Sequence, residues 1–318
     1  MSRLILVRIA YAIPTLIVVS ILVFLATQAL PGDAALTALG RNATPMGVET
    51  FRERFNLNAP LYQQYGEWML NAVRGDFGNS FAAPTSVADL IGSRAANTAI
   101  LVLLTAIVSV PLAVLLGIYT AARRDRAGDQ IVSMIMLVIN ALPEFVLAML
   151  LIVLLATNVL QILPAVSALD PNKPILAQMD LIGLPVLTLG LLVLPYVART
   201  VRACLIDELD SDHIRMARLK GLSERRIVLN HALPNIAGPT LQVVAQSLAW
   251  LAGGIIVIET IFQFPGLGLA MSAAVGSRDV PVVQAITMLL ATFYIIVNIL
   301  ADVGTIALTP TLRRGAPR

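Results

Sequence analysis

The chain has 318 residues, of which 58% are hydrophobic and only 13% are charged, and its mean hydropathy is +0.83. These values exclude an ordinary water-soluble globule and indicate a membrane protein with several spans. The formal net charge of +3 and the scatter of basic residues around apolar runs argue against nucleic-acid binding, and the single cysteine, Cys204, excludes an intramolecular disulfide and a thiolate metal cluster.

Six apolar runs approach or exceed the length of about 20 residues that a helix needs to cross the hydrocarbon core. In chain order they are residues 9–30, 99–122, 131–155, 181–197, 241–262 and 282–308. The first run is too long for the apolar core of a cleaved signal peptide, so we predict a retained first span. The fourth run is the shortest, and Pro185 and Pro195 interrupt it.

An even number of spans places both ends of the chain on one side of the membrane. That side then holds fifteen of the 22 Lys and Arg residues, and five of the other seven lie in the one long loop after the first span. Because positive charge in short loops marks the cytoplasmic side, we predict that both termini are cytoplasmic.

The long loop, residues 31–96, carries Trp68, Tyr62 and Tyr65 among several Gly and Pro turn signals. We predict a polar extracytoplasmic segment of short helices that lie at the membrane surface. Together with the first span it forms an N-terminal region, residues 1–98. The core of five spans covers residues 99–308, and residues 309–318 form a cytoplasmic tail.

A charged loop, residues 207–238, separates the fourth and fifth spans. Side-chain oxygens at positions 210–212 can cap a helix start, and small or apolar residues then recur at helical spacing. Gly221 can adopt a positive φ and end this helix, and Pro234 limits a second one. The pattern predicts a helix, a hinge and a helix, with three basic residues within reach of a cytosolic partner: Arg215, Arg218 and Lys220.

The charged loop resembles the EAA loop of permease subunits of ATP-binding-cassette (ABC) importers. In that loop two small residues are followed four positions later by a glycine. Ala217 and Gly221 match this pattern, whereas Arg215 and Met216 stand where the general pattern has Glu and Ala. Arginine at the first of these positions is usual in the peptide-importer branch.

Nearly the whole chain resembles the B-type permease subunit of dipeptide and oligopeptide importers. The resemblance rests on the order and spacing of short sequences: Leu30-Pro31-Gly32-Asp33, Phe55-Asn56-Leu57-Asn58-Ala59-Pro60, Gln64-Tyr65, Arg74-Gly75-Asp76-Phe77-Gly78-Asn79-Ser80, Arg94 with Thr98, Leu142-Pro143-Glu144-Phe145, His231 with Pro234-Asn235, Glu259-Thr260-Ile261-Phe262, Pro265-Gly266-Leu267-Gly268 and Arg278-Asp279-Val280-Pro281-Val282-Val283-Gln284. The tail departs from the family, because Thr309-Pro310-Thr311 replaces its common Asp-Pro-Arg.

This resemblance implies an all-α polytopic membrane protein with six transmembrane helices, the type I ABC importer permease fold and a cytoplasmic coupling helix. It implies a bacterial or archaeal cytoplasmic (inner) membrane, where the subunit pairs with a second, C-type permease, two cytosolic ATP-binding subunits and an extracytoplasmic solute-binding protein. The chain is expected not to be an enzyme and to bind no cofactor, because the partner ATPases use the ATP and Mg. In agreement, the sequence has no G-x-x-x-x-G-K-[ST] phosphate loop.

The resemblance also assigns roles within the charged loop. Residues 211–220 are expected to be the coupling helix, which docks on one ATPase through Asp212, Arg215, Ala217, Arg218, Lys220 and Gly221. The fold of the loop is expected to be supported by His231, Pro234 and Asn235. His213 and His231 have no third ligand nearby, so we expect no metal site there.

Polar residues inside the spans have two possible roles. They can line the translocation pathway, or they can hydrogen-bond the helices to one another. The candidates for the pathway are Asn140, Gln242, Gln246 and Asn298, with Ser247 beside them.

Acidic residues inside spans are costly and often functional. Pro143 removes a helical hydrogen bond beside Glu144 and can leave a local opening, and the simplest role for Glu144 is pairing within the bundle. Glu259 and Asp302 lie near span ends, where snorkelling or interfacial pairing is favoured over substrate contact.

The resemblance makes a peptide the default substrate, and nickel chelates, glutathione and oligosaccharides stay open because the same family handles them. An ion-driven secondary transporter would use the intramembrane acids as ion ligands, although inverted halves are not evident. An intramembrane hydrolase is disfavoured, because the sequence has no G-x-S-x-G elbow, no paired aspartates on facing spans and no H-E-x-x-H helix.

Overall fold

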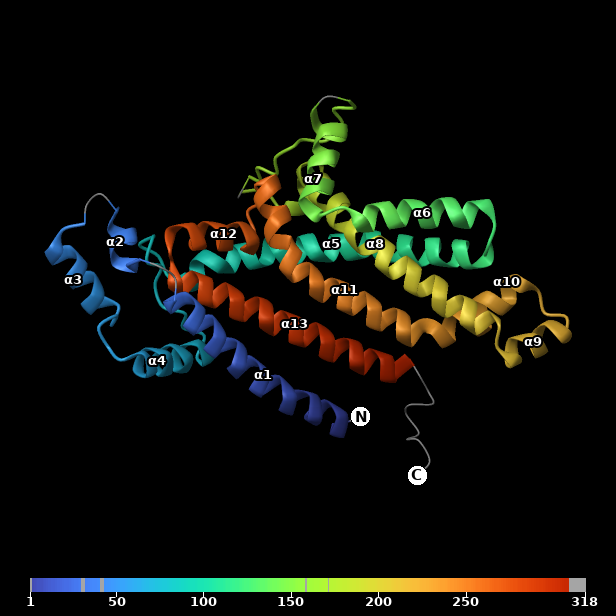
Figure 1. The fold of residues 1–318 in the computed structure, drawn as a ribbon, viewed down its shortest axis with the longest axis horizontal. Coiled ribbons are helices and arrows are strands. Elements are labelled where there is room, and N and C mark those ends of the chain that lie inside the picture. Colours follow the sequence, from blue (N-terminus) through green and yellow to red (C-terminus); the bar gives the residue numbers. More distant parts are fainter. Residues whose placement is uncertain (1, 30–31, 41–42, 158, 171, 309–318) are drawn as a thin grey trace.

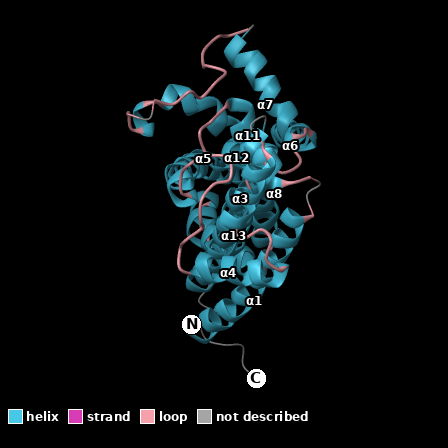
Figure 2. Cartoon of the chain, turned by 90° about the vertical axis from the view of Figure 1, so that its left-hand side faces the viewer, coloured by secondary structure: helices cyan, strands magenta, loops and turns pink. Residues whose placement is uncertain are grey.

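The computed structural model describes residues 2–29, 32–40, 43–157, 159–170 and 172–308. Within these ranges the regular structure is helical, and the only β-type pairing is an isolated bridge between Asn79 and Ser86 (Figure 2). The helices in chain order are α1 (Ser2–Gln28), α2 (Ala34–Leu39), α3 (Pro45–Arg54), α4 (Leu61–Val73), α5 (Val87–Ala122), α6 (Ala127–Ala141), α7 (Glu144–Ile152), α8 (Met179–Leu209), α9 (Asp212–Leu219), α10 (Glu224–Ile227), α11 (Leu233–Phe262), α12 (Leu267–Ser277) and α13 (Val280–Leu308). Two π-helical turns, η2 (Val153–Thr157) and η4 (Val228–Ala232), and one 3₁₀ turn, η3 (Ile175–Ala177), complete them.

The long helices run roughly along the length of the molecule (Figure 1). Helix α8 packs against α5 and α11, α11 packs against α13, and α1 lies outermost, on α13. Four helices have the length and hydropathy of a membrane span: α1, α5, α8 and α13. Two bent pairs bring the candidate spans in the described ranges to six. One pair is α6 with α7, and the other is Glu224–Leu251 with Gly253–Phe262, which both belong to the helical stretch from α10 through α11. The all-α polytopic architecture predicted from the sequence is thereby confirmed.

The third predicted span is not continuous. A single helix over residues 131–155 is expected, and this is wrong, because the chain breaks at Leu142 and Pro143 and the two halves enclose an angle of 107°. Leu142 is extended, with ψ 132°, as the residue before a proline prefers, and Pro143 has no N–H to continue the helix. Helix α7 therefore leaves the bundle and projects from its side (Figure 1).

Two predicted spans are longer than their apolar runs. Helix α8 continues beyond residue 197 despite Pro185 and Pro195, because its buried face continues through Val201 and Leu205. In transmembrane helices, neighbouring helices can satisfy the carbonyls that proline frees. Helix α5 begins at Val87, twelve residues before the expected start, where the side chain of Ser86 accepts a hydrogen bond from the N–H of Asp89.

The largest group of buried side chains lies between α5, α8 and α11. Its members include Leu101 on α5, Leu189 and Val197 on α8, and Ile255 and Ile258 on α11, each at most 1% exposed. Gly117 lets α5 approach α8 closely, since a Cβ atom there would lie 2.7 Å from the carbonyl oxygen of Ala198. This core holds α5, α8 and α11 in place relative to one another, and the loops at both ends of the molecule are attached to these helices.

The short helices predicted for residues 31–96 are α2, α3 and α4, and they gather at one end of the molecule (Figure 1). Asp33 caps α2 by accepting from the N–H of Ala35 at 2.8 Å, and it also forms an ion pair with Arg52 on α3. Further along, the carboxylate of Asp279 accepts from the hydroxyl of Ser80 and from the N–H of Phe81. The segment is thus attached to the turn between α12 and α13. Leu30, Pro31 and the tail over 309–318 lie outside the described residues.

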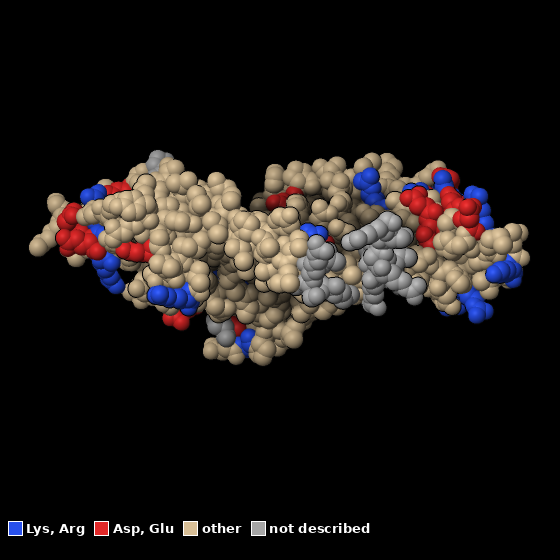
Figure 3. All heavy atoms as spheres, turned by 90° about the horizontal axis from the view of Figure 1, so that it is seen from below, with Lys and Arg blue, Asp and Glu red and all other residues tan. Residues whose placement is uncertain are grey.

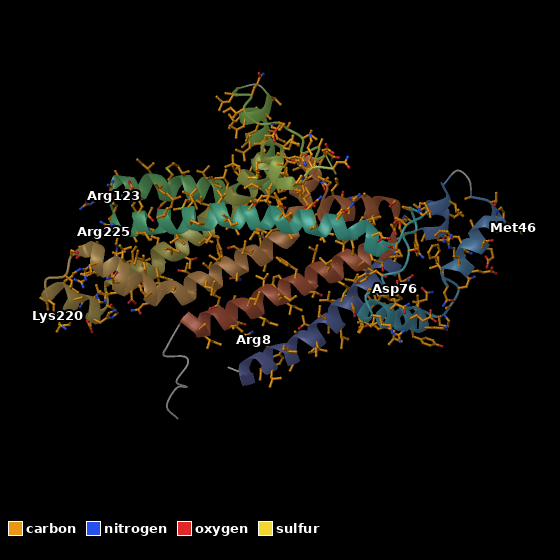
Figure 4. All side chains as sticks on the ribbon, turned by 180° about the vertical axis from the view of Figure 1, so that it is seen from behind. Arg8, Met46, Asp76, Arg123, Lys220 and Arg225 are labelled. Atoms are coloured by element: carbon orange, nitrogen blue, oxygen red, sulfur yellow. The ribbon has the colours of Figure 1, made fainter. Side chains whose placement is uncertain are left out.

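Charged side chains mark the two ends of the molecule. On the face shown in Figure 3 they gather over the N-terminal helices and over α9 and α10, and the middle is largely uncharged. Arg123, Lys220 and Arg225 lie at one end, and Met46 and Asp76 at the other (Figure 4). The N-terminal end of α1 and the C-terminal end of α13 both point toward the end that carries α9 (Figure 1).

Candidate functional site

The predicted helix, hinge and helix of the charged loop are confirmed as α9, Gly221 and α10. The side chains of Ile214 and Ala217 on α9 are buried with Ile227 of α10, and Leu209 and Leu222 pack against them. The opposite face of α9 is open, with Met216 55% and Leu219 81% exposed. Lys220 follows at the outer tip of the molecule (Figure 4). Helix α9 is therefore anchored by one apolar face and presents a second one outward.

Gly221 gives the loop its turn. Its φ is +77°, a conformation that costs a residue with a Cβ atom about 1–2 kcal/mol. Its N–H donates to the carbonyl of Arg218 at 2.9 Å, and the next N–H, of Leu222, donates to the carbonyl of Ala217 at 3.3 Å. Apart from Gly221 and its two neighbours in the chain, no described atom lies within 4 Å of where a Cβ would stand. The need for glycine is thus conformational and not steric.

Arg218 closes the hinge from inside. Its Nε donates to Oε1 of Glu224 at 2.7 Å, a second guanidinium nitrogen donates to Oε2 at 3.3 Å, and a third donates to the carbonyl of Leu209 at 3.2 Å. Donating hydrogen bonds to the Glu224 carboxylate raises the pKa of Arg218. The predicted contact of Arg218 with a partner stays a prediction, and within the chain this residue ties α9 to α10 and to the end of α8.

The other basic residues of the loop are less engaged. Arg215 makes only a loose ion pair with Asp212, at 3.5 Å, and both side chains are exposed. The Lys220 ammonium has no hydrogen-bond or ion-pair partner among the described residues, and it is exposed. These two cations and the exposed Met216 and Leu219 make up the outward face of α9.

The network that supports the loop is centred on Glu208, at the end of α8. Its Oε1 accepts from Nδ2 of Asn235 at 2.6 Å and lies 2.9 Å from Nε2 of His213. Asn235 is one of the predicted support residues. The structure places His213, and not the predicted His231, in this network, since His231 lies exposed on η4.

The sequence predicts that Pro234 limits the second helix, and this prediction is wrong. The helical backbone continues from α10 through the π-helical turn η4 into α11, where Pro234 occupies the first turn. A proline in a first turn needs no N–H donor, and the wider π turn before it adjusts the hydrogen bonding of the preceding carbonyls. The charged loop is therefore joined to α11 without an interruption.

Two ion pairs fix the base of the loop, and sequence reasoning missed both. Asp210 pairs with Arg124 of the α5–α6 turn at 3.1 Å. The buried carboxylate of Asp129, on α6, accepts two hydrogen bonds from Arg202 on α8, at 2.6 and 2.9 Å. Such bidentate pairs are the geometrically specific ones. Their partners stand 73 or more positions apart, so no local pattern indicates them.

The predicted pathway residues are only partly brought together. Asn140, Gln246 and Ser247 line a cavity of about 240 Å³ with Leu192, Val193, Tyr196 and Trp250. Gln242 lies one helical turn before Gln246 and is exposed. Asn298 is not part of this cavity; its side chain donates to the carbonyl of Tyr294 in its own helix at 2.8 Å. Tyr196 and Trp250 are additional lining residues that sequence reasoning missed, because aromatic residues also fit a lipid-facing surface.

The intramembrane acids have three different environments. Glu259 is fully buried and does not snorkel: it accepts from Thr98 and from the N–H of Gly268, both at 2.6 Å. These contacts place a carboxylate at the N-terminus of α12, where the helix dipole stabilises it. Asp302 forms the expected pair, with Nε of Arg8 at 2.9 Å. The pairing expected for Glu144 is missing, since its buried Oε2 has no hydrogen-bond partner in the described part of the chain.

No three His, Cys, Asp or Glu side chains are placed to hold a metal ion in the ranges that the structure describes.

Comparison with known proteins shows which family the sequence of this chain matches. Residues 113–314 match the family described as the binding-protein-dependent transport system inner membrane component, and residues 1–116 match the family described as its N-terminal part. The chain is 38% identical over 306 residues to the glutathione transport system permease protein GsiC of Escherichia coli (strain K12), covering 96% of this chain and 97% of that protein. The proteins of the same name from Shigella dysenteriae serotype 1 and Shigella boydii serotype 4 are 38% and 37% identical, with the same coverage.

Proposed function

Because the chain belongs to the family of inner membrane components of binding-protein-dependent transport systems, as a permease subunit of the ABC importers, we propose that it imports glutathione. The chain is a multi-pass inner membrane protein and is not an enzyme, since the ATPase of these systems is a separate subunit. Its own contribution is one wall of a pathway and a surface that receives the movement of an ATPase.

The observation that carries the choice of substrate is the match to permeases named for glutathione, at 37–38% identity along nearly the full length of both chains. This favours glutathione over the dipeptides and oligopeptides that the sequence resemblance gives as the default. Glutathione is itself a short peptide with a free amino group and two carboxylates. The proposal therefore changes the identity of the cargo and not its chemical class.

The proposed complex contains a second permease, two cytosolic ATPases and an extracytoplasmic solute-binding protein. In it, α9 docks in a groove of one ATPase. The outward face of α9 supports this, because it carries exposed apolar side chains, Met216 and Leu219, between two cations, Arg215 and Lys220. An amphipathic helix that lays an apolar face in a groove is a recurring mode of recognition.

Movement of α9 would reach the spans through specific contacts. Arg218 connects α9 to α10 and to the end of α8, and Glu208 connects α8 to the start of α11 through Asn235. Since the backbone is helical from α10 into α11, a tilt of α9 is passed to α8 and α11, two of the helices that line the cavity at Gln246. Nucleotide-driven closure of the ATPases would thus open and close the pathway.

We place the end that carries α9 in the cytosol, with both termini on that side. The excess of Lys and Arg in the short loops at this end supports the orientation. The end that carries α2, α3 and α4 then faces the binding protein.

The proposal is tested with the complete transporter in proteoliposomes, supplied with the solute-binding protein. We expect uptake of radiolabelled glutathione that requires ATP on the side of the membrane that carries the ATPase subunits. This uptake should persist when ion gradients are dissipated, and excess dialanine should not compete with it. Uptake that continues without ATP and stops when the ion gradient is removed would support a secondary transporter instead. ATP-driven uptake of dialanine in preference to glutathione would restore the peptide as substrate.

A further inference from the structure

The breaks in the two bent spans lie side by side. One is the 107° bend between α6 and α7 at Leu142 and Pro143, and the other is the 52° bend of the α11 span between Leu251 and Gly253. Glu144, the first residue of α7, lies against the second break: a Cβ atom at Gly254 would stand 2.6 Å from its Oε2. Glycine at position 254 is therefore what allows the carboxylate into this position.

Glu144 points into a cavity that is continuous in its lining with the pathway cavity. A space of about 230 Å³ is lined by Ile139, Asn140, Leu142, Pro143, Glu144, Leu192 and Trp250. Asn140, Leu192 and Trp250 also line the cavity at Gln246. In transporters, interrupted helices that surround a cavity are where substrates and coupling ions bind.

The carboxylate of Glu144 lacks the partner that its position requires. Its Oε2 is buried, and no hydrogen bond to it and no ion pair with a basic side chain are found among the described residues. Burying a charged oxygen in a membrane span is costly unless a partner or hydrogen bonds compensate for it. A carboxylate retained under these conditions calls for a cation from outside the chain.

The other lining groups favour an organic ammonium group. Trp250 lines both cavities and Tyr196 lines the one at Gln246, and aromatic rings attract a cation through their faces. The side-chain amides of Asn140 and Gln246 offer carbonyl oxygens that accept from N–H donors. A bare metal ion would require several oxygen ligands close together, which the aromatic lining does not supply.

We propose that Glu144 binds the primary ammonium group of the solute as it passes through the pathway, with Trp250 against the cation. This inference deepens the proposed function and rests on it for the nature of the cargo, because glutathione and peptides both carry such a group. Glu144 is then a residue that determines specificity for cargo with a free amino group.

The decisive comparison uses two probes that differ only at the amino group, glutathione and N-acetylglutathione, and three transporters: the unmodified protein, Glu144→Gln and Glu53→Gln. Glutamine keeps the size of the side chain and removes its charge. Glu53 is an exposed carboxylate on α3, so its replacement is a matched control for the chemical change. Initial rates of ATP-driven uptake are measured in proteoliposomes with saturating binding protein.

We expect Glu144→Gln to lower glutathione uptake about tenfold, which corresponds to about 1.4 kcal/mol, and to change N-acetylglutathione uptake less than twofold. Glu53→Gln should leave both rates unchanged. Equal losses for both probes would overturn the proposal and indicate a structural role or an ion pair with the second permease. Unchanged uptake of both probes would overturn it as well.

A second measurement separates this inference from the proposed substrate. In the purified complex, labelling of Glu144 by a water-soluble carbodiimide and a nucleophile is followed by mass spectrometry. Tetramethylammonium, a cation that cannot react, should slow the labelling severalfold relative to the same concentration of sodium. Absence of protection contradicts an ammonium site, whether or not glutathione is transported. Protection together with failed glutathione uptake retains the site and rejects the substrate.

Discussion

At the scale of single residues, the charged loop depends on one backbone conformation and one side chain. Gly221 supplies the positive φ that turns the chain, and Arg218 holds α9 against α10 and α8. The need for glycine does not depend on the Arg218 side chain, because no described atom outside the adjoining residues lies within 4 Å of a Cβ at Gly221. A substitution at Gly221 therefore changes the angle of α9 without removing a contact.

We predict that Gly221→Val uncouples ATP hydrolysis from uptake. Valine is β-branched and strained at positive φ by about 1–2 kcal/mol or more, so α9 leaves its orientation while the spans stay folded. Glutathione uptake should fall at least tenfold, and the ATPase activity of the assembled complex should remain. Both rates are measured in the same proteoliposomes.

Gly75→Val is the matched control for this prediction. Gly75 also has a positive φ, of +82°, with no described atom within 4 Å of a Cβ, but it follows α4 at the opposite end of the molecule. The same backbone strain at that position should leave coupling intact. If Gly75→Val uncouples transport as strongly as Gly221→Val, strain itself and not the angle of α9 is responsible.

Residues differ in how far the sequence reveals their roles. Gly221 could be predicted, because a glycine four positions after a small residue in a charged loop carries a local signal. The role of Glu259 could not be predicted. One partner, Thr98, stands 161 positions away in the sequence, and another is the backbone N–H at the start of α12, which only the folded chain brings close. The same applies to Asp129 and Arg202, and to the position of Glu144 against Gly254.

At the scale of elements, the short helices α2 and α3 are joined by a charged hydrogen bond. Arg52 on α3 donates to Asp33, which also caps α2, and this hydrogen bond holds the pKa of Asp33 below its usual range. A carboxyl whose pKa is lowered on folding contributes stability above the unfolded pKa, near 4, and loses it as the pH falls.

We therefore predict that α2 and α3 loosen between about pH 5 and pH 3, before the spans do. Hydrogen exchange followed by mass spectrometry, corrected for the intrinsic pH dependence of exchange, should show faster exchange in these helices at the lower pH. The Arg52→Gln variant should already exchange faster at neutral pH and respond less to acid. Equal acid responses in the two proteins would assign the effect to other carboxyl groups.

The helices themselves were largely predictable from composition and spacing, whereas their continuity was not. Apolar runs locate the spans because the membrane requires them, and the opening expected at Pro143 is present. The size of the bend at Pro143 depends on how α7 packs against other helices, which its own sequence does not reveal. The continuation of α8 beyond residue 197 depends on burial of Val201 and Leu205 against neighbours that sequence spacing does not reveal.

At the scale of the whole molecule, charged side chains gather at the two ends and the middle is largely uncharged, as expected if the two ends lie on opposite sides of the membrane (Figure 3). We predict that cysteines introduced by Lys220→Cys and Met46→Cys, each in a Cys204→Ser background, are labelled from opposite sides of the membrane. A membrane-impermeant maleimide should label position 46 from the outside of right-side-out vesicles, and position 220 only after permeabilisation. Labelling of both positions from one side would contradict the topology.

The peripheral place of α1 has a consequence for the order of synthesis. Helix α1 packs mainly on α13, and Thr27 near its end accepts a hydrogen bond from Gln284 at 2.9 Å. Its docking surface is therefore made last, roughly 250 residues later, which at about 5–20 residues per second is a delay of about 10–50 s. Throughout that interval the first span lies in lipid without the helix on which it mainly packs. Its almost wholly apolar sequence suits a helix that waits before it packs.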